Sequence, residues 1–258
     1  MTEQEYRAHQ GINKSTLWEI KRSPAHYKYL LEHPIEDTQA LRFGRALHAA
    51  ILTPSAFKRE YAAAPDCDRR TKEGKETYAL WHSALTPGTT ILSAEEMETI
   101  QGMVKSYRSN KEARALLRNT RREVPKFWTD PETGLLCKCR LDAIKPEAVI
   151  DIKTTLDAST GAFIRDTMKY GYHVQAAHYL KGVEARTGRR SEWYFLVIEK
   201  KPPYCVHILR ASAELIELGA YERARLMEKL RHCIDTDTWP AYESEELTLP
   251  AWAYTEVI

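Results

Sequence analysis

Two short apolar segments near the middle of the chain carry charged residues where a buried strand rarely has them. The segments read LDAI and VIDIKTT, and they contain Asp142, Asp151 and Lys153. Burying a charge is costly unless the charge is paired or binds a metal ion. Two carboxylates and a lysine form a set that can hold a divalent cation beside a phosphate group. The pattern therefore predicts metal-assisted hydrolysis of a phosphodiester.

A turn at residues 146–147 joins the two segments into a predicted hairpin. A turn centred there places Asp142 opposite Asp151, with Cβ atoms about 4.5–5.5 Å apart. Lys153 lies two residues further on and projects to the same side. Two carboxylates this close repel one another, and Mg²⁺ between them would remove the conflict. The alternative interpretation is a structural ion pair in which Lys153 serves both acids.

The five cysteines are scattered along the chain. Cys137 and Cys139 form a C-x-C whose parity is opposite to that of Asp142, so both are expected to face apolar packing. Zinc or an iron–sulfur cluster would need two further ligands at comparable spacing, and the sequence has no second pair. We therefore interpret the cysteines as structural and expect no disulfide framework.

The composition is typical of a globular protein. The 258 residues are 43% hydrophobic and 29% charged, with a formal net charge of +2. A charge this small means that any nucleic-acid surface must come from local clustering. No apolar run approaches the roughly 18 residues of a membrane span, and the start of the chain lacks a signal-peptide pattern. We expect a cytoplasmic protein without a membrane partner.

The first half of the chain favours helices, and the pattern changes at residue 122. We expect helices after the N-cap candidates Asn13 and Ser15, from Pro24 onward, over 38–52 and, as one long helix, over 94–119. The segment 58–76 is expected to be a loop or an exposed helix start. After 122 we expect strands at REVPKFWTD, GLLCKCRLDAI and AVIDIKTT, a helix over 171–187, strands at EWYFLVIEK and PYCVHILRA, a helix over 212–234 and an irregular tail.

This order predicts one α/β domain with a mixed central β-sheet flanked by helices. The whole chain, 1–258, is expected to form a single domain. Its parts are a largely helical region over 1–121, the sheet core over 122–211, and a C-terminal helix and tail over 212–258.

The acidic hairpin resembles the signature of the PD-(D/E)XK nucleases. Asp142 is followed by Asp151-Ile152-Lys153, with Leu141 in place of the proline. Gly44-x-x-x-His48 is similar to the GxxxH motif of the RecB-like branch, and Gln175-Ala-Ala-His-Tyr179 is similar to its QxxxY motif. GINKSTL…SPAHYKY, DRRTKEGKE and TDTWPA…LTLPAWA resemble segments of RecE-type (exonuclease VIII-like) exonucleases of phages and prophages. The resemblance spans about residues 11–253.

The resemblance implies a restriction-endonuclease-like core and a role for each matching residue. The implied metal ligands are His48, Glu123, Asp142, Asp151 and the backbone carbonyl of Ile152. Lys153 would be the catalytic lysine, and Gln175 and Tyr179 would support that lysine or the DNA backbone. The implied catalytic set is thus Lys153, Asp142, Asp151, Glu123, Gln175 and Tyr179. Glu132 and Glu147 are also acidic and close in sequence to Glu123, but both lie in predicted turns.

The resemblance also implies an activity and partners. The activity would be a Mg²⁺-dependent 5′→3′ double-strand DNA exonuclease, with Mn²⁺ as a substitute metal. It would release mononucleotides from linear double-stranded DNA and leave 3′ single-stranded overhangs for recombination by single-strand annealing. The implied partners are a RecT-like annealing protein and further copies of the chain in a ring, with a tetramer favoured and a trimer as the alternative.

Two basic groups are candidates for contacts to DNA phosphates, although each is equally well explained as a solvated face. They are Arg69, Arg70 and Lys72, and then Arg114, Arg118, Arg121 and Arg122. Arg114 and Arg118 would share one face of the helix expected over 94–119.

Three other classes of protein are alternatives to the exonuclease. A RecB/Cas4-like nuclease acting on single strands or repair intermediates would require an iron–sulfur cysteine quartet in its Cas4 form. A catalytically inactive DNA-binding module would have lost Asp142, Asp151 or Lys153. A structural phage protein would leave His48 and Gln175 unexplained.

Overall fold

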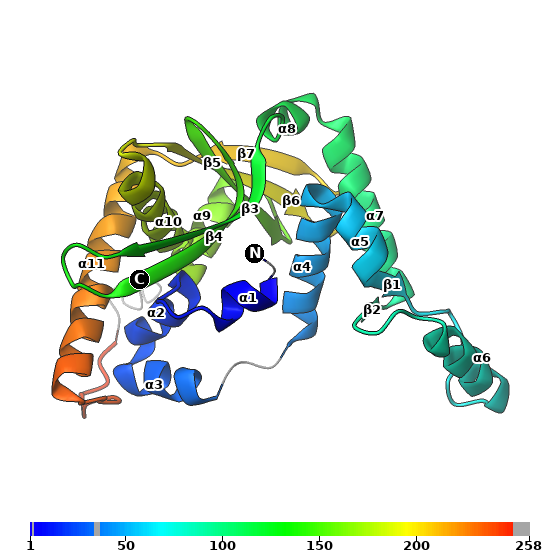
Figure 1. The fold of residues 1–258 in the computed structure, drawn as a ribbon, viewed down its shortest axis with the longest axis horizontal. Helices are drawn as coiled ribbons and strands as arrows, with labels where there is room; N and C mark the ends of the chain where they lie inside the picture. The colour runs from blue at the N-terminus through cyan, green and yellow to red at the C-terminus, as the bar shows by residue number, and fades with distance from the viewer. Residues whose placement is uncertain (2, 34–36, 250–258) are drawn as a thin grey trace, which may run out of the picture.

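A computed structural model describes residues 1, 3–33 and 37–249. Its centre is a five-stranded mixed sheet in the order β3-β4-β5-β6-β7 (Figure 1). The strands are β3 (Arg121–Thr129), β4 (Leu136–Lys145), β5 (Ala148–Thr155), β6 (Glu192–Glu199) and β7 (Val206–Arg210). All neighbouring strands are antiparallel except β5 and β6. The mixed central sheet predicted from the sequence is therefore confirmed.

Helices cover both faces of this sheet. One layer contains α2 (Lys14–Arg22), α3 (Pro24–Glu32), α9 (Thr160–Tyr170), α10 (Tyr172–Thr187) and α11 (Ala213–Thr236). The other contains α4 (Gln39–Leu52), α5 (Pro54–Glu60), α7 (Ala94–Ser109) and α8 (Lys111–Leu116), and the short α1 (Glu3–Ala8) lies near the start of the chain. Helices α9 and α10 form the crossover between the parallel strands β5 and β6. No described helix is long and apolar enough to cross a membrane.

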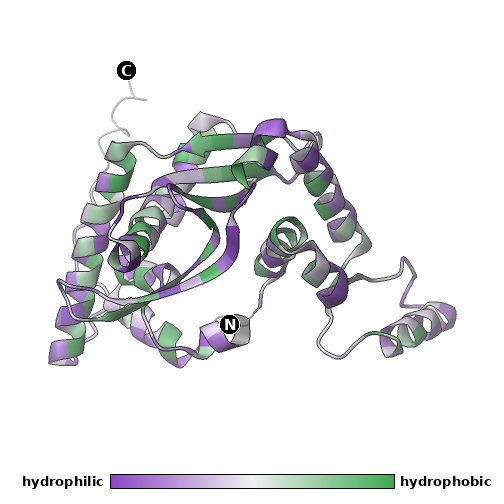
Figure 2. Cartoon of the chain, turned by 45° about the horizontal axis from the view of Figure 1, so that its top comes forward, coloured by the Kyte–Doolittle hydropathy of each residue, from purple (hydrophilic) through white to green (hydrophobic). Residues whose placement is uncertain are grey.

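The hydrophobic core is divided by the sheet into two clusters. Strand β6 shows the division, because its side chains alternate between the two faces. Trp193, Phe195 and Val197 belong to the cluster beneath α10 and α11, whereas Leu196 and Ile198 belong to the cluster beneath α4 and α7. Figure 2 shows hydrophobic residues concentrated on the strands and on the inner sides of the helices. The predicted packing of the C-x-C cysteines in the core is confirmed, since both are fully buried.

The predicted N-terminal helices are confirmed together with one of their two cap candidates. The Asn13 side chain accepts the backbone N–H of Thr16 at 2.9 Å and starts α2, whereas Ser15 lies inside the first turn. Ser23 ends α2 and caps α3, and Pro24 occupies the first position of α3. Proline is favoured there because its missing N–H would have no helical partner.

The single helix expected over 94–119 is wrong, because the chain breaks at Asn110. Asn110 ends α7 and starts α8, and its side chain accepts the backbone N–H of Ala113 at 2.9 Å. An asparagine that bonds to the following turn competes with continuation of the helix. Helix α8 then ends at Leu116, so Arg118 does not share a helix face with Arg114. Helix α9 was not predicted at all.

Residues 61–92 form an arm that projects from the rest of the molecule. Strand β1 (Tyr61–Ala63) pairs in parallel with β2 (Thr90–Leu92), and α6 (Lys72–Ser83) extends outward between them (Figure 1). Helix α6 begins inside the segment 58–76, as expected, with Thr71 as its N-cap. Leu80 on α6 is 76% exposed, so this helix contributes little to the core.

Candidate metal and active site

Strands β4 and β5 pair over a short distance and then separate, and the acidic residues lie where the separation begins. The paired positions are Ala143 with Ile150, Ile144 with Val149, and Lys145 with Ala148. This register is the one predicted from the sequence. The next pair of facing positions, just beyond Ala143 and Ile150, is Asp142 and Asp151. The Asp142 carboxylate accepts the backbone N–H of Ile152 at 2.7 Å. A side chain thus takes a hydrogen bond that would otherwise require a strand partner.

Glu123 brings a third carboxylate to the same row. The neighbouring pairs, Arg122 with Ala143 and Val124 with Leu141, place Glu123 opposite Asp142. Glu123 itself has a left-handed backbone with φ of 52°. This conformation costs a non-glycine residue about 1–2 kcal/mol, and such strain is concentrated at functional sites. Three adjacent strands therefore present one acidic residue each, in a line across the sheet.

His48 reaches this row from helix α4. Ligand atoms of His48, Glu123 and Asp142 all lie within 4.8 Å of one another. The His48 Nδ1 atom is 3.3 Å from Asp142 Oδ1, and its Nε2 atom is 3.0 Å from the carbonyl oxygen of Ile152. Gly44 lies one turn earlier on the same helix, and a Cβ atom there would meet no atom within 4 Å. The surface beside His48 is therefore left open.

His48 and Asp142 stabilise one another's charged forms. Burial alone lowers the pKa of His48, but the charge and the hydrogen bond of Asp142 outweigh burial and raise it above the usual value. Burial likewise raises the pKa of Asp142, and His48, Lys153 and the Ile152 N–H more than reverse this effect. Asp142 is consequently ionised at neutral pH.

Asp151 has a different environment, since its carboxylate is almost completely buried. Gln175 of α10 donates a 2.6 Å hydrogen bond to Oδ1. Lys153 Nζ forms an ion pair with Oδ2 at 2.5 Å. Burial, with a contribution from the nearby Asp142 charge, raises the pKa of Asp151 to about 6 against the opposing effect of Lys153. Lys153 therefore supplies a positive charge that compensates part of the cost of burying this carboxylate.

These residues fit a divalent cation. Carboxylate and carbonyl oxygens suit Mg²⁺ and Mn²⁺, and imidazole is compatible with the softer Mn²⁺. The ligand atoms of His48, Glu123 and Asp142 converge within 4.8 Å of one another, as the ligands of one ion would. The residues that would hold the ion are His48, Glu123, Asp142, Asp151 and the carbonyl of Ile152. Of these predicted ligands, the structure brings the side chains of His48, Glu123 and Asp142 together, and the Ile152 carbonyl oxygen lies 3.0 Å from His48. The Asp151 carboxylate lies on the next strand and contacts Lys153 and Gln175.

Tyr179, in contrast, lies mainly in the core. It follows Gln175 by one turn of α10, and its ring packs edge-on against Trp193 with centroids 5.9 Å apart. Burial raises the pKa of Tyr179 well above its usual value, with small contributions from Asp142 and Asp151. Its contacts are those of a packing residue close to the site. Leu141, which replaces the proline of the signature, is fully buried in the same cluster.

The first predicted basic group lies on the projecting arm, away from the carboxylates (Figure 1). Its charges interact with other residues of the arm. The Arg69 guanidinium lies 4.0 Å from the ring centroid of Tyr78. Arg70 donates two 2.9 Å hydrogen bonds to Asp68, and Lys72 lies 3.9 Å from Glu76.

The second basic group is closer to the row of acids. Arg121 and Arg122 begin β3 immediately before Glu123, and both are exposed. The Arg122 guanidinium also donates a 2.7 Å hydrogen bond to the carbonyl of Leu52 at the end of α4. Arg114 lies on α8, and Arg118 lies in the turn between α8 and β3.

Two residues near the site were not singled out from the sequence. Arg140 lies 2.7 Å from Glu123, and its parity with Asp142 on β4 was a usable signal. Lys14 lies near Lys153 because α2 packs beside the sheet, and no local pattern indicated that proximity. Burial and the charge of Lys153 together lower the pKa of Lys14 to about 7.

The fold and this arrangement of residues define the PD-(D/E)XK class: a mixed sheet whose central strands separate at an aspartate, followed by an Asp-x-Lys strand. The chain belongs to the family described as "PDDEXK-like domain of unknown function (DUF3799)", whose model matches residues 14–249. The resemblance inferred from the motifs is therefore confirmed at the level of this class. No curated protein matches the chain.

The chain is similar to several solved structures at low sequence identity. A proposed exonuclease from Eubacterium rectale is 11% identical, with a TM-score of 0.61 over 100% of this chain and 99% of the other. A phage-related exonuclease from Haemophilus somnus is 14% identical, with a TM-score of 0.36 over 91% of this chain and 100% of the other. The alkaline exonuclease of Laribacter hongkongensis is 15% identical, with a TM-score of 0.29 over 74% and 95%.

Proposed function

We propose that the protein is a metal-dependent deoxyribonuclease that hydrolyses phosphodiester bonds. The observation that carries the proposal is the row of Glu123, Asp142 and Asp151 on three adjacent strands, with His48 against it and Lys153 on Asp151. A structural role alone would not favour three acidic residues in one row, because like charges at this distance repel one another.

Each residue has a distinct task in this proposal. A divalent cation bound by the row would polarise a phosphate oxygen and lower the pKa of a nearby water molecule. Lys153 is placed to stabilise negative charge on the phosphate and to orient the attacking water. Gln175 fixes the orientation of the Asp151 carboxylate through its 2.6 Å hydrogen bond. Gly44 leaves space beside His48 through which a DNA backbone can approach.

We infer further that the substrate is linear double-stranded DNA, digested in the 5′→3′ direction to leave a 3′ overhang. The support is the co-occurrence of the GxxxH, DxK and QxxxY motifs with RecE-like segments. On the same basis Mg²⁺ is the metal, with Mn²⁺ as a substitute, a single-strand annealing protein is the partner, and the assembly is a ring of four or three copies. Arg114, Arg118, Arg121 and Arg122 are the proposed phosphate contacts nearest the site, and Arg69, Arg70 and Lys72 are proposed contacts on the arm.

The test is digestion of linear double-stranded DNA labelled at either the 5′ or the 3′ ends, with Mg²⁺ or with EDTA. Early, metal-dependent loss of the 5′ label, with a covalently closed circle left intact, is the expected result. Asp151→Ala and Lys153→Ala should abolish cleavage and still fold. Asp66→Ala and Lys105→Ala, at exposed positions away from the site, are the matched controls.

Other outcomes point to different functions. Cleavage of the circle would indicate an endonuclease. Preferential digestion of single strands would indicate the RecB-like alternative, and no cleavage of any substrate would indicate a binding module. Full activity of Asp151→Ala would refute the assignment of the site.

A further inference from the structure

A row of alternating cations and aromatic rings leads away from the catalytic lysine. Lys153 Nζ lies 4.8 Å from the ring centroid of Tyr172, and Lys14 Nζ lies 6.0 Å from the same ring. Lys14 is also 5.0 Å from the centroid of Trp18, and Lys21 is 4.4 Å from it on the far side of the row. We call these five residues the Lys–aromatic row. It connects the carboxylates of the sheet to the surface of α2.

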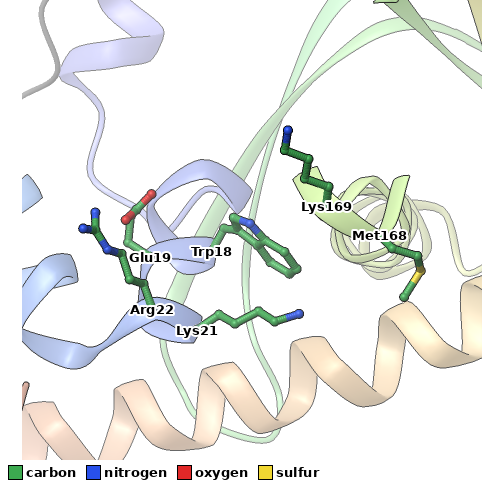
Figure 3. A pocket seen from close by; sticks show the side chains of 6 residues that line it. All are labelled: Trp18, Glu19, Lys21, Arg22, Met168 and Lys169. Atoms are coloured by element: carbon green, nitrogen blue, oxygen red, sulfur yellow. The ribbon is translucent and has the colours of Figure 1, made fainter. Parts of the chain in front are cut away.

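The row ends in a cleft between α2 and α9 with a volume of about 470 Å³. Figure 3 shows Trp18 facing Met168 and Lys169 across this cleft, with the side chain of Lys21 running beside the indole. Three cations line the cleft with a single acid, and the complete lining is Trp18, Glu19, Lys21, Arg22, Met168 and Lys169. An excess of positive charge beside an accessible aromatic ring suits a polyanion that carries flat bases.

Contacts with neighbouring elements hold the row in place before any ligand binds. Gly171 has φ of 66°, and a Cβ atom there would lie 2.7 Å from the Trp18 indole, so the ring packs directly on the backbone between α9 and α10. Lys14 donates a hydrogen bond to the carbonyl of Tyr170, and Lys21 forms a 2.5 Å ion pair with Glu222. Such groups lose little conformational freedom when a ligand arrives.

Lys14 also lies in an environment that disfavours its charge. Burial, and then the charge of Lys153, lower its pKa to about 7 against the opposing charges of Asp151 and Glu19. A phosphate placed beside Lys14 would favour its charged form. The space beside Lys14 therefore favours an anion, and Lys14 lies between Tyr172 and Trp18 in the Lys–aromatic row.

We propose that the Lys–aromatic row binds the strand that is cleaved, with phosphates beside Lys14 and Lys21 and a nucleobase against Trp18. The row begins at Lys153, so a strand lying along it has a phosphodiester at the carboxylates and its neighbouring nucleotides in the α2–α9 cleft. Phosphate contacts supply affinity without reading sequence. The identification of the ligand as DNA rests on the proposed function.

Binding can be measured separately from cleavage. The probe is a fluorescein-labelled single strand of eight thymidines, followed by anisotropy in EDTA at several salt concentrations. Trp18→Ala should weaken binding about 5- to 100-fold, the usual effect of removing one stacking residue. Lys14→Gln and Lys21→Gln should each weaken it several-fold and reduce the slope of log Kd against log salt by roughly 0.7. Trp81→Ala on α6 and Lys105→Gln on α7 are the matched controls and should leave binding unchanged.

The outcomes separate this proposal from the proposed nuclease activity. Absence of binding by the wild-type protein, or row variants that bind like the controls, would overturn the row even if the protein digests DNA. Weakened binding of the row variants in a protein that never cleaves DNA would refute the nuclease and retain the row as a strand-binding site. Should Trp18→Ala fail to fold, the two lysine variants decide, and Trp18→Phe should keep most of the affinity.

Discussion

Glu123 and Asp142 lie opposite one another across β3 and β4, although Glu123 has a left-handed backbone. The residue pairs on both sides keep the same register, so this conformation is not accompanied by an inserted residue. Strand pairing on both sides thus holds the Glu123 carboxylate close to the Asp142 carboxylate and to the His48 imidazole. The strain is local, and it is offset by the regular sheet around it.

Glu123→Gln should weaken metal binding about 10-fold or more, because it removes a charged ligand and leaves the backbone unchanged. Calorimetric titration of the DNA-free protein with Mn²⁺ measures this directly. Glu147→Gln, an exposed residue in the β4–β5 turn, should bind Mn²⁺ like the wild type. Equal affinities of the two variants would remove Glu123 from the set of metal ligands.

Gln175→Ala should lower kcat for DNA cleavage about 10- to 100-fold and change KM little, because a carboxylate that has lost its orienting bond supports the reaction poorly. The effect of the substitution is indirect, through Asp151. Steady-state kinetics on end-labelled DNA separate the two constants. Gln101→Ala on the exposed side of α7 is the control, and a pure KM effect would argue for a DNA contact instead.

Gly44→Ala should raise the free energy of unfolding by about 0.5–1 kcal/mol, because alanine favours a helix interior more than glycine does. A Cβ atom at this position meets no atom of the protein, so no clash opposes the gain. The same variant should cleave DNA more slowly, since the methyl group narrows the open surface beside His48. Urea unfolding and cleavage rates measured together test both parts. Undiminished cleavage would show that DNA does not approach over Gly44.

His178 should make the protein less stable in mild acid. Burial, together with the charge of the adjacent Arg223, lowers its pKa to about 3. The unfolded chain therefore takes up a proton below about pH 6.5 that the folded chain does not bind, so stability is lost as the pH falls through that range. Between about pH 7.5 and pH 5, the wild type should lose about 2 kcal/mol relative to His178→Gln, which does not titrate. The free energy of unfolding is measured for both proteins by urea titration at each pH. Equal losses in the two proteins would show that His178 is protonated in the folded state.

The part of the site that follows from local sequence was predictable, and the part that depends on distant packing was not. The turn at 146–147 was enough to fix the β4–β5 register, since side chains alternate strictly along a strand. The short parallel pair β1–β2 joins segments separated by a whole helix, and no alternation marks strands of three residues. Lys14 and Trp18 reach the site only because α2 packs next to the α9–α10 junction. The sequence alone allows Asn110 either to continue a helix or to end one. In the structure it ends α7, because its side chain accepts the backbone N–H of Ala113 and starts α8.

The hydrogen bond from the Ile152 amide to Asp142 provides a spectroscopic reporter of the site. In a ¹⁵N-labelled sample, an amide proton that donates to a carboxylate resonates in a position sensitive to the charge on that carboxylate. A cation that takes up electron density from Asp142 should move the Ile152 cross-peak, while amides on the projecting arm remain unchanged. Occupancy of the metal site can then be followed residue by residue, without DNA and without turnover.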